Sequence, residues 1–154
     1  MVVVDSAVVD YATLITGMDP TIPVIVLQSG ENTLEGMARA LSTYHNLDAI
    51  HWVTEGRTGG IQLGDHLLTE TDLLDHSAPI QTIGNTLKPG GDLLLYGCSV
   101  AGNEMGQRFV NTLDQLLGDA DVAASTDRTG PSHMGGDWDL EFSTGQIDTV
   151  LPFT

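Results

Sequence analysis

Two stretches decide the fold, "AIHWVTEG" (Ala49–Gly56) and "DLLLYGCS" (Asp92–Ser99). Each contains a short run dominated by apolar residues and ends in a glycine-containing turn. Runs without a polar alternation are typical of strands that are buried on both faces of a parallel sheet. The carboxyl ends of parallel strands meet at one edge of the sheet. If the two strands are neighbours, Glu55 and Cys98 therefore lie on the same rim.

The rest of the chain alternates between further apolar runs and segments with helical spacing, which predicts an α/β fold. We expect a three-layer α/β/α sandwich whose mostly parallel sheet has about six strands. Pro79 is expected to kink or split the second helix, and Gly59–Gly64 to form a small hairpin. Strands are expected at residues 2–4, 24–27, 49–53, 93–96, 121–125 and 138–143, and helices at 34–41, 70–87 and 104–117.

The size and the acidic composition of the chain limit its domain count and its possible binding partners. The chain has 154 residues, which suits a single domain over residues 1–154. Its 5 Lys and Arg against 21 Asp and Glu give a formal charge of −16, which excludes nucleic acid and anionic membranes as favoured partners. No apolar run reaches the roughly 20 residues of a membrane span. We expect no cofactor.

The opening residues, "MVVVDSAVVD", lack the basic start and long apolar segment of a signal peptide. The sequence leaves two possibilities open, a cytoplasmic protein or a domain taken from a longer protein. The start in a strand favours the second.

Cys98 is the one cysteine of the chain. Gly97 lets the backbone turn sharply and exposes the sulfur, and the N–H of Gly56 is suitably placed to face a developing oxyanion. A free cysteine is as often a small buried hydrophobic residue. From position alone, a nucleophile and a core residue are equally good interpretations.

The chain also resembles a known family. The blocks "IHWVTEGRTGGIQLGD", "GGDLLLYGCSVAG", "DVAAST" with "DRTG", and "GGDWDLEFSTG" are similar to those of the bacterial domain of unknown function 4347. That domain often stands near the start of very large secreted or surface repeat proteins. It is itself similar to the clan of cysteine peptidases that contains caspases, gingipains and clostripain. The resemblance covers residues 3–145.

The resemblance implies a caspase-like fold and a peptidase site. In that clan one strand ends in His-Gly and the next ends in the cysteine. The cysteine corresponds to Cys98, and His-Gly corresponds to Glu55-Gly56, so the catalytic histidine is replaced. A nearby carboxylate disfavours the reactive thiolate, and an ionised glutamate cannot protonate a leaving amine. We therefore expect a cysteine-peptidase-like domain that is inactive or severely impaired.

The family role implied is proteolytic processing of a secreted or surface protein. The substrate would be a peptide or protein, including the parent chain of the domain. One alternative is a non-enzymatic module that binds peptides or assists assembly at the same rim. Another is an acidic α/β domain without a live site. Whether glutamate at position 55 is natural or introduced stays open.

No other histidine is an obvious replacement. His51 lies about 13 Å down the strand from Glu55 and is expected in the core. His133, in a glycine-rich loop, is the one candidate that could fold over the rim, and His45, His66 and His76 are expected at the surface. Ser125 and Asp127 are expected to line a substrate groove that prefers a basic side chain.

Asp137-Trp138-Asp139 offers carboxylates, which suit a calcium ion. Solvated turn aspartates beside a core tryptophan are the favoured interpretation, so we expect no metal.

Overall fold

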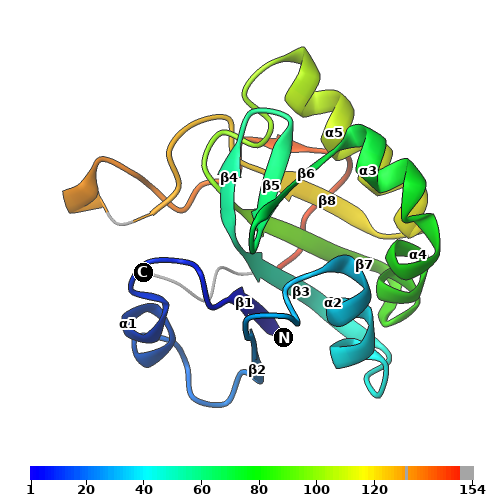
Figure 1. The fold of residues 1–154 in the computed structure, drawn as a ribbon, viewed down its shortest axis with the longest axis horizontal. Coiled ribbons are helices and arrows are strands. Elements are labelled where there is room, and N and C mark those ends of the chain that lie inside the picture. The colour runs from blue at the N-terminus through cyan, green and yellow to red at the C-terminus, as the bar shows by residue number, and fades with distance from the viewer. Residues whose placement is uncertain (131, 150–154) are drawn as a thin grey trace.

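A six-stranded sheet forms the centre of the protein, in a computed structural model that describes residues 1–130 and 132–149. Its strand order is β2-β1-β3-β7-β8-β9 (Figure 1). The first five strands are parallel and β9 is antiparallel to β8. This confirms the predicted mostly parallel sheet of an α/β/α sandwich. In sheet order the strands are β2 (Val24–Leu27), β1 (Val2–Asp5), β3 (Leu47–Val53), β7 (Leu87–Tyr96), β8 (Asp121–Ala124) and β9 (Phe142–Ser143).

Helices cover one face of this sheet. Trp52 and Leu95 point from the central strands into a large apolar cluster that also contains Met37, Ile80 and Phe109 from three helices. Alternate strand residues point to opposite faces, so the continuous apolar runs supply a second core on the other side. The helices are α2 (Leu34–Leu41), α3 (Glu70–Asp75), α4 (Ser77–Asn85) and α5 (Glu104–Leu117).

The opposite face has a thinner cover. Val4, Val53 and Leu94 pack there against α1 (Tyr11–Thr16). They also pack against partly buried residues of the C-terminal segment, which is residues 138–149. Helix α1 was not predicted. Its six residues are too few for a clear helical period, although apolar residues at Val8, Tyr11 and Ile15 in the same cluster carry the signal.

A small antiparallel sheet stands at the carboxyl ends of the central strands (Figure 1). It consists of β4 (Glu55–Arg57), β5 (Gly60–Leu63) and β6 (His66–Thr69), so the predicted hairpin is one part of a three-stranded unit. The buried carboxylate of Asp5, at the end of β1, accepts a hydrogen bond from the Gly64 N–H at 3.3 Å. This bond ties the small sheet to the large one.

The expected helix over residues 70–87 is wrong in its length. It is split at His76, which ends α3 and precedes α4. This confirms the split expected from Pro79, since in a continuous helix its ring would clash with the carbonyl group of Asp75. With the break at His76, Pro79 lies in the first turn of α4, where a missing N–H costs nothing.

Two strands also differ from the prediction. Strand β7 begins at Leu87, earlier than the expected residue 93, because it pairs with Leu47 before an irregularity in the β3 ladder. The expected strand over residues 138–143 shrinks to the two residues of β9, and Trp138 packs against the second core instead.

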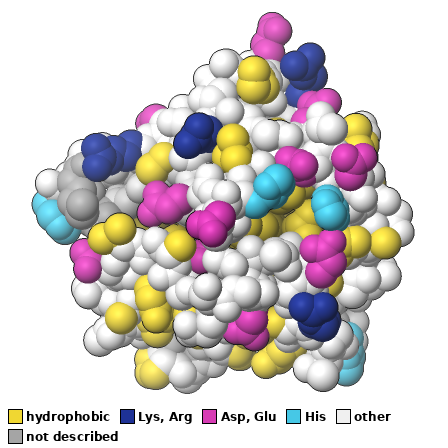
Figure 2. All heavy atoms as spheres, viewed as in Figure 1, with side chains coloured by type: hydrophobic (Ala, Val, Ile, Leu, Met, Phe, Trp, Pro, Cys, Tyr) yellow, Lys and Arg dark blue, Asp and Glu magenta, His cyan; other side chains and the backbone are white. Residues whose placement is uncertain are grey.

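Helices of the described residues are too short or too polar to cross a membrane. Acidic side chains are spread over the face seen in Figure 2, with few basic ones among them.

Candidate active site

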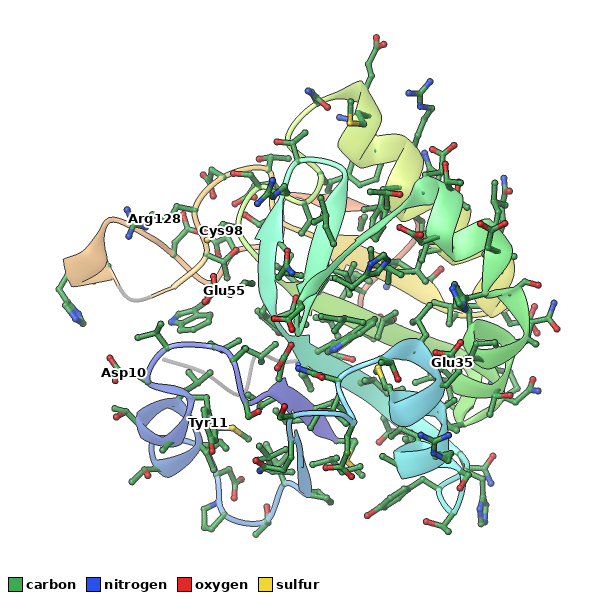
Figure 3. The ribbon with its side chains drawn as sticks, viewed as in Figure 1. Asp10, Tyr11, Glu35, Glu55, Cys98 and Arg128 are labelled. Carbon is green, nitrogen blue, oxygen red and sulfur yellow. The ribbon has the colours of Figure 1, made fainter. Side chains whose placement is uncertain are left out.

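Glu55 and Cys98 lie on one rim. Strands β3 and β7 are parallel neighbours, and Val53 pairs with Tyr96 at their ends. Each strand therefore reaches its candidate residue two positions later. Both side chains lie at the same end of the sheet (Figure 3). Glu55 is exposed and opens strand β4, whereas Cys98 is half-buried.

The two glycines of the rim are in backbone contact. A Cβ atom placed on Gly56 would lie 2.9 Å from the Cα and carbonyl carbon of Gly97 and 2.8 Å from Val100 Cγ2. Cβ atoms in proteins do not approach other atoms this closely. Any side chain here would push the two strand ends apart. The predicted oxyanion role of the Gly56 N–H stays a prediction, whereas the contact explains why a glycine stands there.

The turn after Cys98 is tight and strained. Ser99 has a φ of 58°, in the left-handed region that is uncommon for residues other than glycine. Its N–H donates to the carbonyl oxygen of Asp127 at 2.6 Å, and the Ala101 N–H donates to the carbonyl oxygen of Ser125 at 2.9 Å. The segment after β8 thus holds the turn in place.

Thr129 contacts the cysteine itself. The Cys98 thiol donates to the Thr129 carbonyl oxygen across 3.6 Å. The Thr129 hydroxyl in turn donates to the carbonyl oxygen of Gly97 at 3.2 Å. The thiol therefore has a hydrogen-bond acceptor on the protein backbone, and its neighbours Gly97 and Ser99 are bound to the same loop.

Ser125 and Asp127 lie beside the rim but differ in exposure. Ser125 is fully buried, and its hydroxyl donates to Asp127 and to Glu141 Oε1, each at 3.1 Å. Asp127 is exposed. The structure thus gives Ser125 a part in the support beneath the Cys98 turn.

Glu141 holds this support together from the other side. Its Oε1 also accepts bonds from the N–H and hydroxyl of Thr126, at 2.9 and 3.2 Å. Burial opposes the charge of Glu141, but hydrogen bonds from the Thr126 N–H, its own N–H and the hydroxyls of Ser125 and Thr126 prevail and lower its pKa. Reasoning from the sequence missed both Glu141 and Thr129. The fragments "DRTG" and "DLEF" around them carry no chemical signal of their own.

The carboxylates beside the rim include one group of metal-binding size. Asp127, Asp137 and Glu141 bring oxygen atoms within 4.8 Å of one another, and all three residues are exposed. Oxygen ligands suit calcium. The group shares Asp137 with the segment considered from the sequence. Exposed carboxylates also gather in this way without an ion, so the cluster alone does not define a metal site.

The histidines do not join Cys98 in the described residues. His51 is buried, stacks on Tyr96, and places Nδ1 3.1 Å from the Tyr96 hydroxyl. Burial lowers the pKa of His51 to about 4. His133 is exposed in a short 3₁₀ helix, Ser132–Met134. His66 and His76 contact Asp72 and Glu35 at 3.5 and 2.8 Å, which leaves them on the helical side.

Comparison with known proteins yields one match. A family model described as "Domain of unknown function (DUF4347)" matches residues 1–154. No curated protein and no solved structure matches the chain.

Proposed function

The chain belongs to the DUF4347 family, and we propose that it is a cysteine-peptidase-like domain whose nucleophile position is Cys98 and whose chemistry Glu55 turns off. The observation that carries this proposal is the register of β3 and β7, which brings both residues to one rim. A caspase-like origin of the rim belongs to the proposal as well.

The arrangement of the thiol fits a nucleophile position. Cys98 lies two positions after the end of β7, is half-buried, and is followed by Ser99 in the left-handed region. Backbone contact between Gly56 and Gly97 leaves no room for a larger side chain at Gly56. A peptide carbonyl would reach the sulfur from the open side of this turn.

Two features keep the thiol unreactive. Glu55 stands where an imidazole would act as base and acid, and an ionised carboxylate cannot protonate a leaving amine. The Thr129 carbonyl oxygen accepts a hydrogen bond from the thiol, and this contact would become repulsive if the sulfur lost its proton. Cleavage therefore requires a new residue at position 55, and the Thr129 loop would move aside as the thiol reacts.

Processing of a secreted or surface protein is the role we assign to an active form. Its substrate would be an extended peptide, including one in the parent chain. The acidic residues beside the rim, Asp127 and Glu141, favour a basic side chain in that peptide.

The test compares the protein with its Glu55→His variant. Alkylation of Cys98 by iodoacetamide is followed from pH 5 to 10, and self-cleavage is followed by mass spectrometry. Glu55→Gln removes the charge without adding an imidazole, and Cys98→Ala reports background. We expect Glu55→His to cleave and to shift the midpoint of alkylation to lower pH. Glu55→Gln should change the alkylation only modestly.

If the unmodified protein cleaves a peptide and this activity depends on Cys98, the proposal that Glu55 inactivates the domain is wrong. Inertness of all variants would favour a second function, a peptide-binding module. One observation supports that alternative: β4 pairs with β5 on one side only, so its edge beside the rim is able to accept an extended peptide.

A further inference from the structure

A second feature lies at the opposite end of the sheet, where β7 begins. A surface hollow of about 330 Å³ opens there. Its wall combines the starts of β7 and β3 with residues 148–149 of the C-terminal segment. The lining residues are Asp48, Lys88, Gly90, Asp92, Asp148 and Thr149.

Asp92 is the unusual member of this wall. It is only 2% exposed. Its Oδ2 accepts hydrogen bonds from the Asp148 N–H at 3.1 Å and the Thr149 hydroxyl at 2.6 Å. Its Oδ1 is buried and has no hydrogen-bond partner. A buried carboxylate oxygen without a partner is costly, since the charge loses its hydration and gains nothing in exchange.

The surrounding charges increase that cost. Asp121 is the partner of Asp92 on β8. Burial raises the pKa of Asp121, and the carboxylates of Asp92, Asp114 and Asp148 raise it further. Lys88, the cation of the lining, is already engaged by Asp48 at 2.9 Å. The charges of Asp148 and Asp92 also raise the pKa of Lys88, after that of Asp48. One lysine therefore faces three carboxylates of the lining, which leaves the hollow with an excess of negative charge.

We propose that this hollow binds a divalent cation of the calcium class, with the carboxylates of Asp92 and Asp148 as its ligands. The donors available in the lining are oxygen atoms, with no thiol or imidazole among them, which suits a hard cation and disfavours zinc. Calcium accepts an irregular set of ligands and completes it with water. An open hollow of this size has room for that water.

The carboxylates beside Cys98 do not carry the same argument. Asp127, Asp137 and Glu141 are exposed, so water already solvates them. Asp92 differs because its oxygen is removed from water and unpaired. The ion would join β7 to the segment around Asp148, and so fasten the C-terminal segment to the sheet.

Calorimetric titration of the chelator-treated 154-residue chain with calcium chloride tests the proposal, at high potassium chloride to suppress diffuse binding. We expect one site with a Kd on the order of 10⁻⁴ to 10⁻³ M, as in extracellular calcium modules. Calcium at 100 times Kd should raise the thermal midpoint by about 5 °C.

Two variants locate the site. Asp92→Asn and Asp148→Asn should each weaken calcium binding at least tenfold. Asp148→Asn keeps the backbone N–H that Asp92 accepts, so it removes a ligand without releasing the C-terminal segment. Glu141→Gln alters the other acidic group and should leave the Kd unchanged. Absence of binding, or binding lost in Glu141→Gln but kept in Asp148→Asn, would overturn the proposal.

Discussion

The two ends of the central sheet differ in how their buried polar groups are hydrogen-bonded. At the rim, the Cys98 turn is held by hydrogen bonds from the segment after β8. The buried atom left without a partner there is the neutral hydroxyl of Thr54. At the Asp92 hollow it is a carboxylate oxygen. An unpaired charged group costs more than an unpaired neutral one. The turn at the rim is therefore held by bonds within the chain, whereas the hollow keeps a buried carboxylate oxygen without a hydrogen-bond partner.

The largest expected effect comes from adding a side chain at Gly56, where the ends of β3 and β7 are in backbone contact. Gly56→Ala places a Cβ atom against backbone atoms of Gly97, and overpacking of this kind should cost about 3 kcal/mol. Urea unfolding measures the loss. Gly17→Ala is the matched control, because its Cβ atom would meet carbonyl oxygens at an ordinary 3.7 to 3.8 Å. Equal stability of the two variants would mean that the rim tolerates separation of its strands.

Acid should destabilise the fold through His51, which is buried between the two ends of the sheet. Burial lowers the pKa of His51 from 6.5 to about 4, so the unfolded chain binds a proton that the folded chain refuses. The resulting stability is fully present above pH 6.5 and is lost as the pH falls towards 4. The loss should be about 2 to 3 kcal/mol, measured by urea unfolding at several pH values.

His51→Phe keeps an aromatic ring against Tyr96 and removes the titration, so its stability should fall less over that interval. His45→Gln changes an exposed histidine and should keep the slope of the unmodified protein. An unchanged slope in His51→Phe would assign the acid sensitivity to the carboxylates.

The smallest expected effect tests whether Thr129 restrains the Cys98 turn. Thr129→Val removes the hydroxyl that binds the Gly97 carbonyl oxygen, at a cost of about 1 kcal/mol. The loosened loop should expose Cys98 and speed its alkylation severalfold. Thr126→Val is the control, since that hydroxyl binds Glu141 and not the Cys98 turn. Equal alkylation rates in both variants would show that Thr129 does not restrain the thiol.

Reasoning from the sequence reached the sheet and the rim because both depend on short-range patterns. Runs such as Ile50–Val53 and Leu93–Tyr96 indicate buried parallel strands, and glycines after them mark their ends. The adjacency of β3 and β7 was only a condition at that point, and their pairing in the structure meets it. Helix α1 was not reached, because tertiary packing rather than the local period sets its boundaries. The split of the long helix was expected from Pro79, although not its position at His76.

The contacts around Cys98 were out of reach for a different reason. Thr129 and Glu141 lie 31 and 43 positions after Cys98 in the sequence. Thr129 contacts the thiol through its backbone carbonyl oxygen. A backbone acceptor leaves no trace in residue type. Asp92 was likewise hidden, because nothing in the sequence distinguishes a buried aspartate from the many solvated ones of this acidic chain.

The unequal covering of the sheet gives the molecule two built-in optical reporters. Trp52 is buried beneath the helices, and Trp138 packs against the thinner layer on the other face. These are the two tryptophans of the chain. Single Trp→Phe replacements would let fluorescence follow each layer separately. A layer held by α1 and a C-terminal segment should loosen before the helical one, so Trp138 emission should change at a lower denaturant concentration than Trp52 emission.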